Sequence, residues 1–161
     1  MGSLLFASSI CAQTKSNVPN APIGYKGGVD VGFSWIPDSS GAYTWDLSTP
    51  HGYQVNPYLF VGGGIGFSAI DAGSGFYFLP IFASLSGNIP VGKNFYPFGG
   101  VRLAYFLDRF RGIYAYPHID CTYMFDKSKL GLDFMLGYTI QRMSMAEANL
   151  NSLSIKVGLR F

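Results

Sequence analysis

The sequence predicts an all-β protein, an eight-stranded antiparallel up-and-down transmembrane β-barrel, from three observations. Aromatic residues make up 17% of the 161 positions and glycine supplies 21 of them, while charged residues reach only 12%, about half the share in soluble domains. No stretch approaches the roughly 18 consecutive apolar residues that a transmembrane helix requires. After residue 24, apolar and polar residues alternate with period two, as in strands with one face toward lipid.

The first 24 residues are expected to lie outside the barrel. Leu4–Ala12 is a short apolar run that ends in small residues, and the polar segment Gln13–Asn20 follows it. This order is typical of a secretory signal peptide, although a basic start is missing. We therefore assign residues 1–24 to a signal-peptide remnant with a flexible tail and residues 25–161 to the barrel. A flexible leader without a targeting role is the alternative.

Eight segments after residue 24 show the alternation, and turn-forming residues separate them at intervals of about twelve residues. Each segment is long enough for the roughly 9 to 11 residues that a tilted strand needs to cross a bilayer. The expected strands are Tyr25–Ile36, Tyr43–Gln54, Tyr58–Ala69, Phe76–Asn88, Phe95–Leu107, Gly112–Phe125, Leu130–Arg142 and Ser152–Phe161.

The connections between these segments differ in length. Val55–Pro57 and Asp126–Lys129 are short, whereas Pro37–Ala42 and Met143–Asn151 are longer and polar. Outer-membrane barrels carry short turns on the periplasmic side and longer loops outside. Because the number of strands is even, we expect both termini on the periplasmic side of a bacterial outer membrane.

Side chains of successive strand residues point to opposite faces, so each expected strand can be divided by parity. One face is apolar, with members such as Val31, Phe33, Leu103 and Leu136. The other face combines charged and polar residues with many glycines. We expect the apolar face to meet lipid and the polar face to line the interior of the barrel, the lumen.

The charged residues on the polar face are balanced, with four basic and four acidic side chains besides one histidine. Charges in a narrow barrel are tolerable only when they are paired and hydrogen-bonded. Eight strands leave an interior that side chains just fill, and the glycines on this face provide room for long basic side chains. We therefore expect a lumen plugged by an ion-pair network of Lys26, Asp30, Asp46, Arg102, His118, Asp120, Asp133, Lys156 and Arg160.

Aromatic residues on the apolar face gather near the strand ends in two groups. Amphipathic rings favour the interface between acyl chains and water, which predicts an aromatic girdle at each interface. The alternative is that the rings are ordinary strand formers in a soluble sheet. The girdle residues are Trp35, Trp45, Phe67, Tyr77 and Tyr105 toward the long loops and Tyr25, Tyr53, Phe95, Tyr123 and Phe125 toward the short turns.

The last expected strand alternates perfectly and ends on a terminal phenylalanine. It resembles the C-terminal signal by which the outer-membrane insertion machinery recognises barrels, carried here by Ile155, Val157, Gly158, Leu159 and Phe161. The segment HGYQVNPYLFVGGGIG, residues 51–66, resembles small outer-membrane β-barrel proteins of the Bacteroidetes type, and the similarity spans most of residues 25–161. The resemblance implies the fold and the location but no functional residues. More distantly, the architecture is similar to the OmpA and OmpX type of eight-stranded barrel.

One pair of residues could carry chemistry. His118 and Asp120 lie on the same face of one strand, where a histidine beside a carboxylate could act as a base or ligand. We favour a structural role, because no third group lies at a suitable position and a site in mid-barrel would lack an entry path. No metal-ligand spacing appears, so we expect no metal, no cofactor and no catalytic residue.

We therefore expect a monomeric outer-membrane barrel with a structural or surface-interaction role and no catalysis. Its expected partners are membrane lipid, lipopolysaccharide and the insertion machinery. The net charge of +2 is dispersed along the chain, which argues against a nucleic-acid partner. Three alternatives stay open: a narrow channel for small solutes or ions, a lipid-modifying barrel enzyme, and a soluble lipocalin-like carrier with its apolar face inward.

Overall fold

The computed structural model describes residues 23–37, 41–71, 76–89, 91, 94–107, 112–125, 130–143 and 149–161. Of the expected signal-peptide remnant and tail, residues 1–22 lie outside the described residues and stay a prediction, whereas Gly24 already belongs to the first strand. No helix among the described residues is both long and apolar enough to cross a bilayer. The strands are β1 (Gly24–Trp35), β2 (Tyr43–Asn56), β3 (Leu59–Asp71), β4 (Phe76–Phe78), β5 (Pro80–Asn88), β6 (Phe95–Phe106), β7 (Gly112–Met124), β8 (Gly131–Met143) and β9 (Asn149–Arg160).

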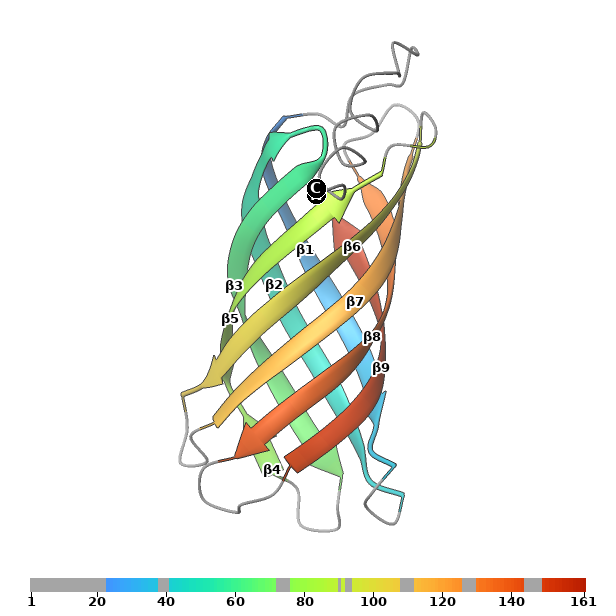
Figure 1. Ribbon diagram of the computed structural model, residues 1–161. Helices are drawn as coiled ribbons and strands as arrows, with labels where there is room; N and C mark the ends of the chain where they lie inside the picture. The colour runs from blue at the N-terminus through green and yellow to red at the C-terminus, as the bar shows by residue number, and fades with distance from the viewer. Residues whose placement is uncertain are drawn as a thin grey trace, which may run out of the picture.

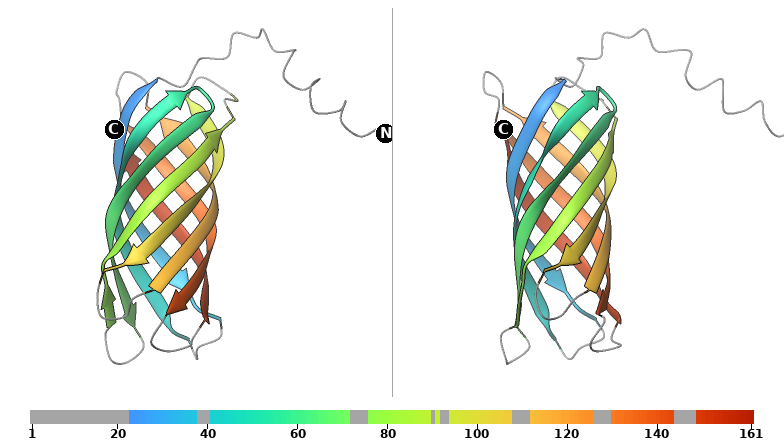
Figure 2. Two further views of the ribbon diagram at one scale, coloured as in Figure 1. Left: turned by 60° about the vertical axis from the view of Figure 1, so that its left-hand side comes forward. Right: turned by 90° about the vertical axis from the view of Figure 1, so that its left-hand side faces the viewer.

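The strands form one closed antiparallel barrel of eight strands, in which β4 and β5 together make up the fourth (Figure 1). The cylinder closes between the first and last strands: Val31 of β1 lies opposite Val157 of β9, and Gly27 and Phe161 exchange two backbone hydrogen bonds of 2.9 Å. The expected fold class is therefore confirmed. We call the end where β1 starts and β9 stops the terminal end, and the opposite end the loop end (Figure 2).

The fourth strand is interrupted at Leu79, between β4 and β5. Pro80 follows, and proline has no backbone N–H to donate to a neighbouring strand. The register with β3 is the same on both sides of the interruption, because Ser68 lies opposite Phe78 and Ile65 opposite Ile81. The segment expected as one strand is therefore one strand with a gap in its hydrogen bonding, and it contains no inserted residue.

The other strand boundaries differ from the expected ones by at most three residues. The largest difference is at β9, which begins at Asn149 because the pairing with β8 continues to Arg142. At the turn between β2 and β3, the Asn56 Oδ1 accepts a hydrogen bond of 2.8 Å from the Tyr58 amide, a contact that asparagine commonly makes in turns. The turn residues therefore located the connections, but not the last paired position of each strand.

The two faces of the barrel wall have opposite polarity. Outward-pointing side chains are apolar and exposed, as in Val31 (53% exposed) and Leu103 (58%), whereas Asp30 and Arg102 on the inner face are 0% and 4% exposed. This polarity is the reverse of a soluble carrier with an apolar interior. The lipocalin-like alternative is therefore wrong for this structure.

Glycines on the inner face make room for the bulky side chains of the lumen. A Cβ at Gly137 would lie 2.5 Å from the Tyr116 ring, and one at Gly32 would lie 2.7 Å from Lys156 Cγ. A Cβ at Gly158 would overlap the Asp30 carboxylate. Real Cβ atoms do not approach so closely, so a larger residue at these positions would displace the packed side chains.

Replacement of Gly158 by alanine tests this account. We expect Gly158→Ala to lower the free energy of unfolding by about 1–3 kcal/mol, because the new methyl group forces Asp30 out of place. Gly87→Ala is the matched control, since a Cβ there would meet its nearest atom at an ordinary 3.8 Å. Urea unfolding of the barrel in detergent or vesicles measures both. Equal losses from the two variants would contradict the prediction.

Candidate functional site in the barrel lumen

Four charged residues from four strands meet in the middle of the lumen. Asp30 on β1 accepts a hydrogen bond of 2.9 Å from Arg102 Nη2 on β6. Arg160 on β9 binds both Asp30 and Asp133, the latter on β8. The two aspartates have no exposed side-chain surface. This central cluster therefore holds two fully buried carboxylates, which are stable there only because each meets a guanidinium group.

Neutral side chains complete the surroundings of the central cluster. The Ser48 and Thr122 hydroxyls donate to Asp30 and Asp133, at 3.5 and 2.9 Å. The Arg102 guanidinium lies 5.2 Å from the centroid of the Phe82 ring, a cation–π geometry. The fully buried Met135 places its sulfur 3.3 Å from Arg102 Nη2. The cluster is thus packed from several sides.

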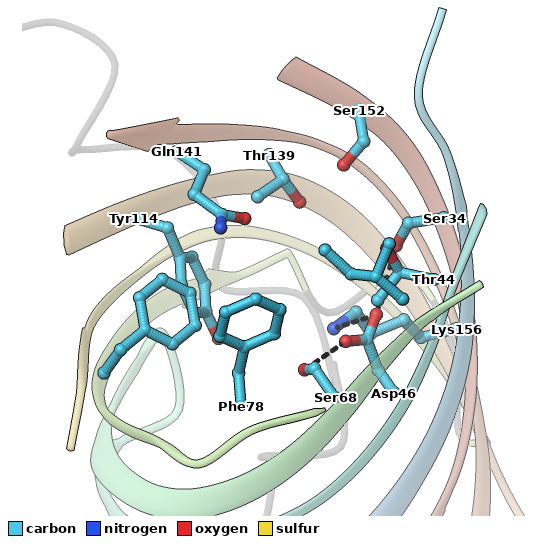
Figure 3. A pocket seen from close by; sticks show the side chains of 12 residues that line it. Ser34, Thr44, Asp46, Ser68, Phe78, Tyr114, Thr139, Gln141, Ser152 and Lys156 are labelled. Atoms are coloured by element: carbon cyan, nitrogen blue, oxygen red, sulfur yellow. Dashed lines mark hydrogen bonds and ion pairs between the residues drawn. The ribbon is translucent and has the colours of Figure 1, made fainter. Parts of the chain in front are cut away.

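A second ion pair lies nearer the loop end. Lys156 Nζ is 3.4 Å from Asp46 Oδ2, and the hydroxyls of Ser34 and Ser68 donate to the same carboxylate at 3.1 and 2.6 Å (Figure 3). The ammonium group also lies 5.0 Å from the centroid of the Tyr116 ring. Figure 3 shows Ser34, Asp46, Ser68 and Lys156 together on one side of the pocket, where the strands β1, β2, β3 and β9 are neighbours.

The third pair, His118 and Asp120, is the one that sequence analysis considered for chemistry. His118 Nε2 lies 3.3 Å from Asp120 Oδ2, and its Nδ1 lies 2.9 Å from the Tyr116 carbonyl oxygen. The imidazole also stacks on the Tyr116 ring at 5.0 Å between centroids. These contacts fix the orientation of the ring. No group of three or more His, Cys, Asp or Glu side chains in the described part of the chain could hold a metal ion.

Lys26 lies apart from these pairs, contrary to its expected place in the network. Its ammonium group donates to Gln54 Oε1 at 3.1 Å, which also accepts from Asn88 Nδ2 at 3.1 Å. Lys26 lies near the start of β1, four residues before Asp30 and therefore about 13 Å from it along the strand. No acidic side chain among the described residues forms an ion pair with it.

A cavity of about 480 Å³ occupies the terminal half of the lumen. It extends from rim residues Ile23 and Phe161 to Arg102, His118 and Asp120. The expectation that a mid-barrel site lacks an entry path is therefore wrong for this pair. Small side chains such as Ser84 and Ser86 line the cavity together with the aromatic residues Phe60, Tyr96 and Phe98.

In the loop half of the lumen, an apolar cluster on one wall faces polar side chains on the other, among them Thr44 and Ser152. Ile70, Phe78 and Phe106 form a buried cluster against Tyr114. The cavity beneath them is only about 30 Å³, room for roughly one water molecule. Between this small cavity and the large one lies Tyr116, which is 1% exposed. The lumen is thus narrow at two levels, the central one at Tyr116 and the other beside the apolar cluster.

The expected girdle residues all point outward. Each of the ten rings is exposed, from Phe67 at 41% to Tyr77 at 63%. Neighbouring rings also contact one another, as Phe67 and Tyr77 do at 5.5 Å between centroids. In the expected insertion signal the apolar side chains face outward, while Gly158 faces the central cluster.

Sequence analysis missed the hydroxyl groups that serve the aspartates. The sequence does not single out Ser34, Ser48, Ser68 and Thr122, because serine and threonine are ordinary residues on either face of a strand. Their parity, which matches that of the charged residues, is the signal that could have identified them.

No family model matches this chain, and no curated protein matches it. The chain is similar to a barrel from the de novo design of transmembrane beta-barrels, with 20% identity, 88% of this chain and 99% of that chain covered, and a TM-score of 0.52. It is similar to the outer membrane enzyme PagL at 14% identity, with 83% and 98% covered and a TM-score of 0.50. The Yersinia pestis outer membrane protein Ail aligns at 11% identity over 86% and 99%, with a TM-score of 0.44.

These comparisons show the fold. The chain has the architecture of eight-stranded transmembrane barrels, and outer-membrane proteins are among its structural neighbours. At these identities the likeness shows nothing about activity. The resemblance to the Bacteroidetes type stays a prediction.

Neutralising Asp30 tests the importance of the central cluster. Asp30→Asn keeps the shape of the side chain but leaves Arg102 and Arg160 with a single carboxylate between them. We expect the free energy of unfolding to fall by about 3–5 kcal/mol, as when one partner of a buried pair is removed. Asp71→Asn, at an exposed position where Tyr43 donates at 2.6 Å, is the control and should cost at most about 1 kcal/mol. Denaturant unfolding in detergent compares them, and a small loss at Asp30 would refute the prediction.

Proposed function

We propose that this chain is an integral outer-membrane barrel that does not conduct, with a structural or surface-interaction role and no catalysis. The observation that supports the proposal is the dense packing of the lumen at two levels, at the buried Tyr116 and at the cluster of Ile70, Phe78 and Phe106, beside which the cavity is only about 30 Å³. A continuous passage would have to cross both levels. The cavity of the terminal half reaches His118 but does not extend past Tyr116.

The proposed orientation places the terminal end in the periplasm and the loop end outside the cell. The fold of the structural neighbours supports an outer membrane. The outward rings would lie at the two interfaces, where amphipathic side chains favour the boundary between lipid and water. The alternating last strand would present the signal that the insertion machinery recognises. Membrane lipid and lipopolysaccharide would surround a single barrel.

The channel and enzyme alternatives have weaker support. A channel needs a water path, and the described side chains fill the lumen at two levels. The likeness to PagL concerns the fold alone, because the identity is 14%. His51 faces outward at the terminal end, where its Nδ1 lies 2.6 Å from the Tyr25 hydroxyl. In the proposed orientation, this histidine lies away from the outer leaflet.

Planar-bilayer recording tests the closed lumen. We expect purified barrel to insert without a steady open state, and a conducting porin in the same bilayers serves as the positive control. Phe106→Ala, which removes one ring from the cluster near the loop end, should also show no steady conductance, because Tyr116 still fills the middle of the lumen. A steady conductance in the unmodified barrel would contradict the proposal. Recovery of the protein with the membrane pellet after carbonate washing separately tests its membrane location.

A further inference from the structure

A shallow groove crosses the lipid-facing side of β5, β6, β7 and β8. Its volume is about 720 Å³, and its lining is apolar except for Arg142. Ala83 and Ala115 expose small side chains within it, while Leu103, Tyr105 and Ile113 project around them. The groove exists because two alanines stand where most outward positions carry large side chains.

The strand register places these residues in two neighbouring rows. Ile81, Tyr105, Ile113 and Arg142 lie opposite one another along one row, and Ala83, Leu103, Ala115 and Ile140 along the next. The cation therefore lies at one end of the groove, toward the loop end, and the small residues lie deeper along the barrel wall. A strip of small apolar residues with a cation at one end matches the outline of an acyl chain with an anionic head group.

We propose that this groove binds a phosphate-bearing membrane lipid, with one acyl chain over Ala83 and Ala115 and the phosphate held by Arg142. The inference rests on the proposed membrane location. It adds a specific lipid site to a barrel that otherwise needs only bulk lipid around it.

The position of Arg142 favours phosphate as its partner. Its side chain is exposed and points outward, and it has no ion pair or hydrogen bond with any described residue. Tyr105, an expected girdle ring, lies in the same row, which sets Arg142 at the depth of the lipid head groups. A guanidinium presents several donors in one plane and binds phosphate through two parallel hydrogen bonds.

A second copy of the chain fits the groove less well. Two identical concave surfaces facing each other would leave the space between the alanines unfilled and would bring two Arg142 side chains into one interface. Asp71 is the one carboxylate side chain that points outward from the described strands. It lies on β3, away from the groove, and accepts a hydrogen bond from Tyr43. Charge complementarity therefore favours an anionic lipid.

Native mass spectrometry of the barrel released from detergent tests the site. The probes are phosphatidylglycerol and a diacylglycerol with the same acyl chains but no phosphate. We expect Arg142→Gln to weaken the binding of phosphatidylglycerol about tenfold or more, as for the loss of charge-assisted hydrogen bonds. Arg142→Lys should retain part of the affinity, and diacylglycerol binding should be weak and unaffected by either change.

The groove itself is tested by filling it. The double substitution Ala83→Leu with Ala115→Leu should abolish the retention of phosphatidylglycerol. The control is Ala69→Leu, which should leave the retention unchanged, because Ala69 points outward from β3 and does not line the groove. Leucine is favourable on a lipid-facing surface, so both variants should fold.

Three results would overturn the inference: phosphatidylglycerol binding that is the same with and without Arg142, equal effects of the groove and control substitutions, or barrel dimers in place of lipid adducts. The unmodified barrel is first recovered with membranes after carbonate washing. If it is not recovered there, the proposed function fails; if it is recovered but retains no lipid, only the lipid site fails.

Discussion

Asp30 has no exposed surface, and its charge is stable inside the barrel because two arginines reach it from different strands. Arg160 comes from β9, beside β1 in the wall, whereas Arg102 comes from β6 and must cross the lumen. Both contacts therefore depend on the closed cylinder. They also depend on glycine at the neighbouring inner positions, since a methyl group at Gly158 would occupy the space of the carboxylate. The pairing of these charges thus links closure of the sheet, side-chain volume and the packing of the lumen.

The two halves of the lumen are filled by different side chains. Toward the terminal end, Ser84 and Ser86 line the large cavity together with the aromatic residues Phe60, Tyr96 and Phe98. Toward the loop end, Phe78, Phe106 and Tyr114 pack against one another beside a cavity of only about 30 Å³. Since aromatic residues face the lumen in both halves, the way they pack across it decides where the interior is open. The mouth of the larger cavity lies where β1 starts and β9 stops.

Period-two alternation predicted the strands and their faces well, because successive side chains of a strand point to opposite faces. A shift of one residue would place Asp30 or Arg102 on the apolar outer face, so the charged residues fix the parity. It could not predict which charges pair: Lys26 has the parity of the network, but its height along the axis puts it beside Gln54. Height depends on strand tilt and register, which a single sequence does not specify. Pro80 was visible in the sequence, yet the alternation continues through it and concealed the interruption. The cavity was missed because its volume depends on packing across the lumen and not along one strand.

The gap at Leu79 also bears on where the barrel wall is weakest. On the side of β6 the pairing is continuous, since the Leu79 carbonyl accepts a hydrogen bond of 3.1 Å from the Leu107 amide. The described pairs with β3 stop at Ile81 and resume at Phe78, on either side of the gap. Backbone groups without partners are costly among hydrocarbon chains. The weak point that Pro80 creates is therefore confined to one seam of the cylinder, between β3 and the fourth strand.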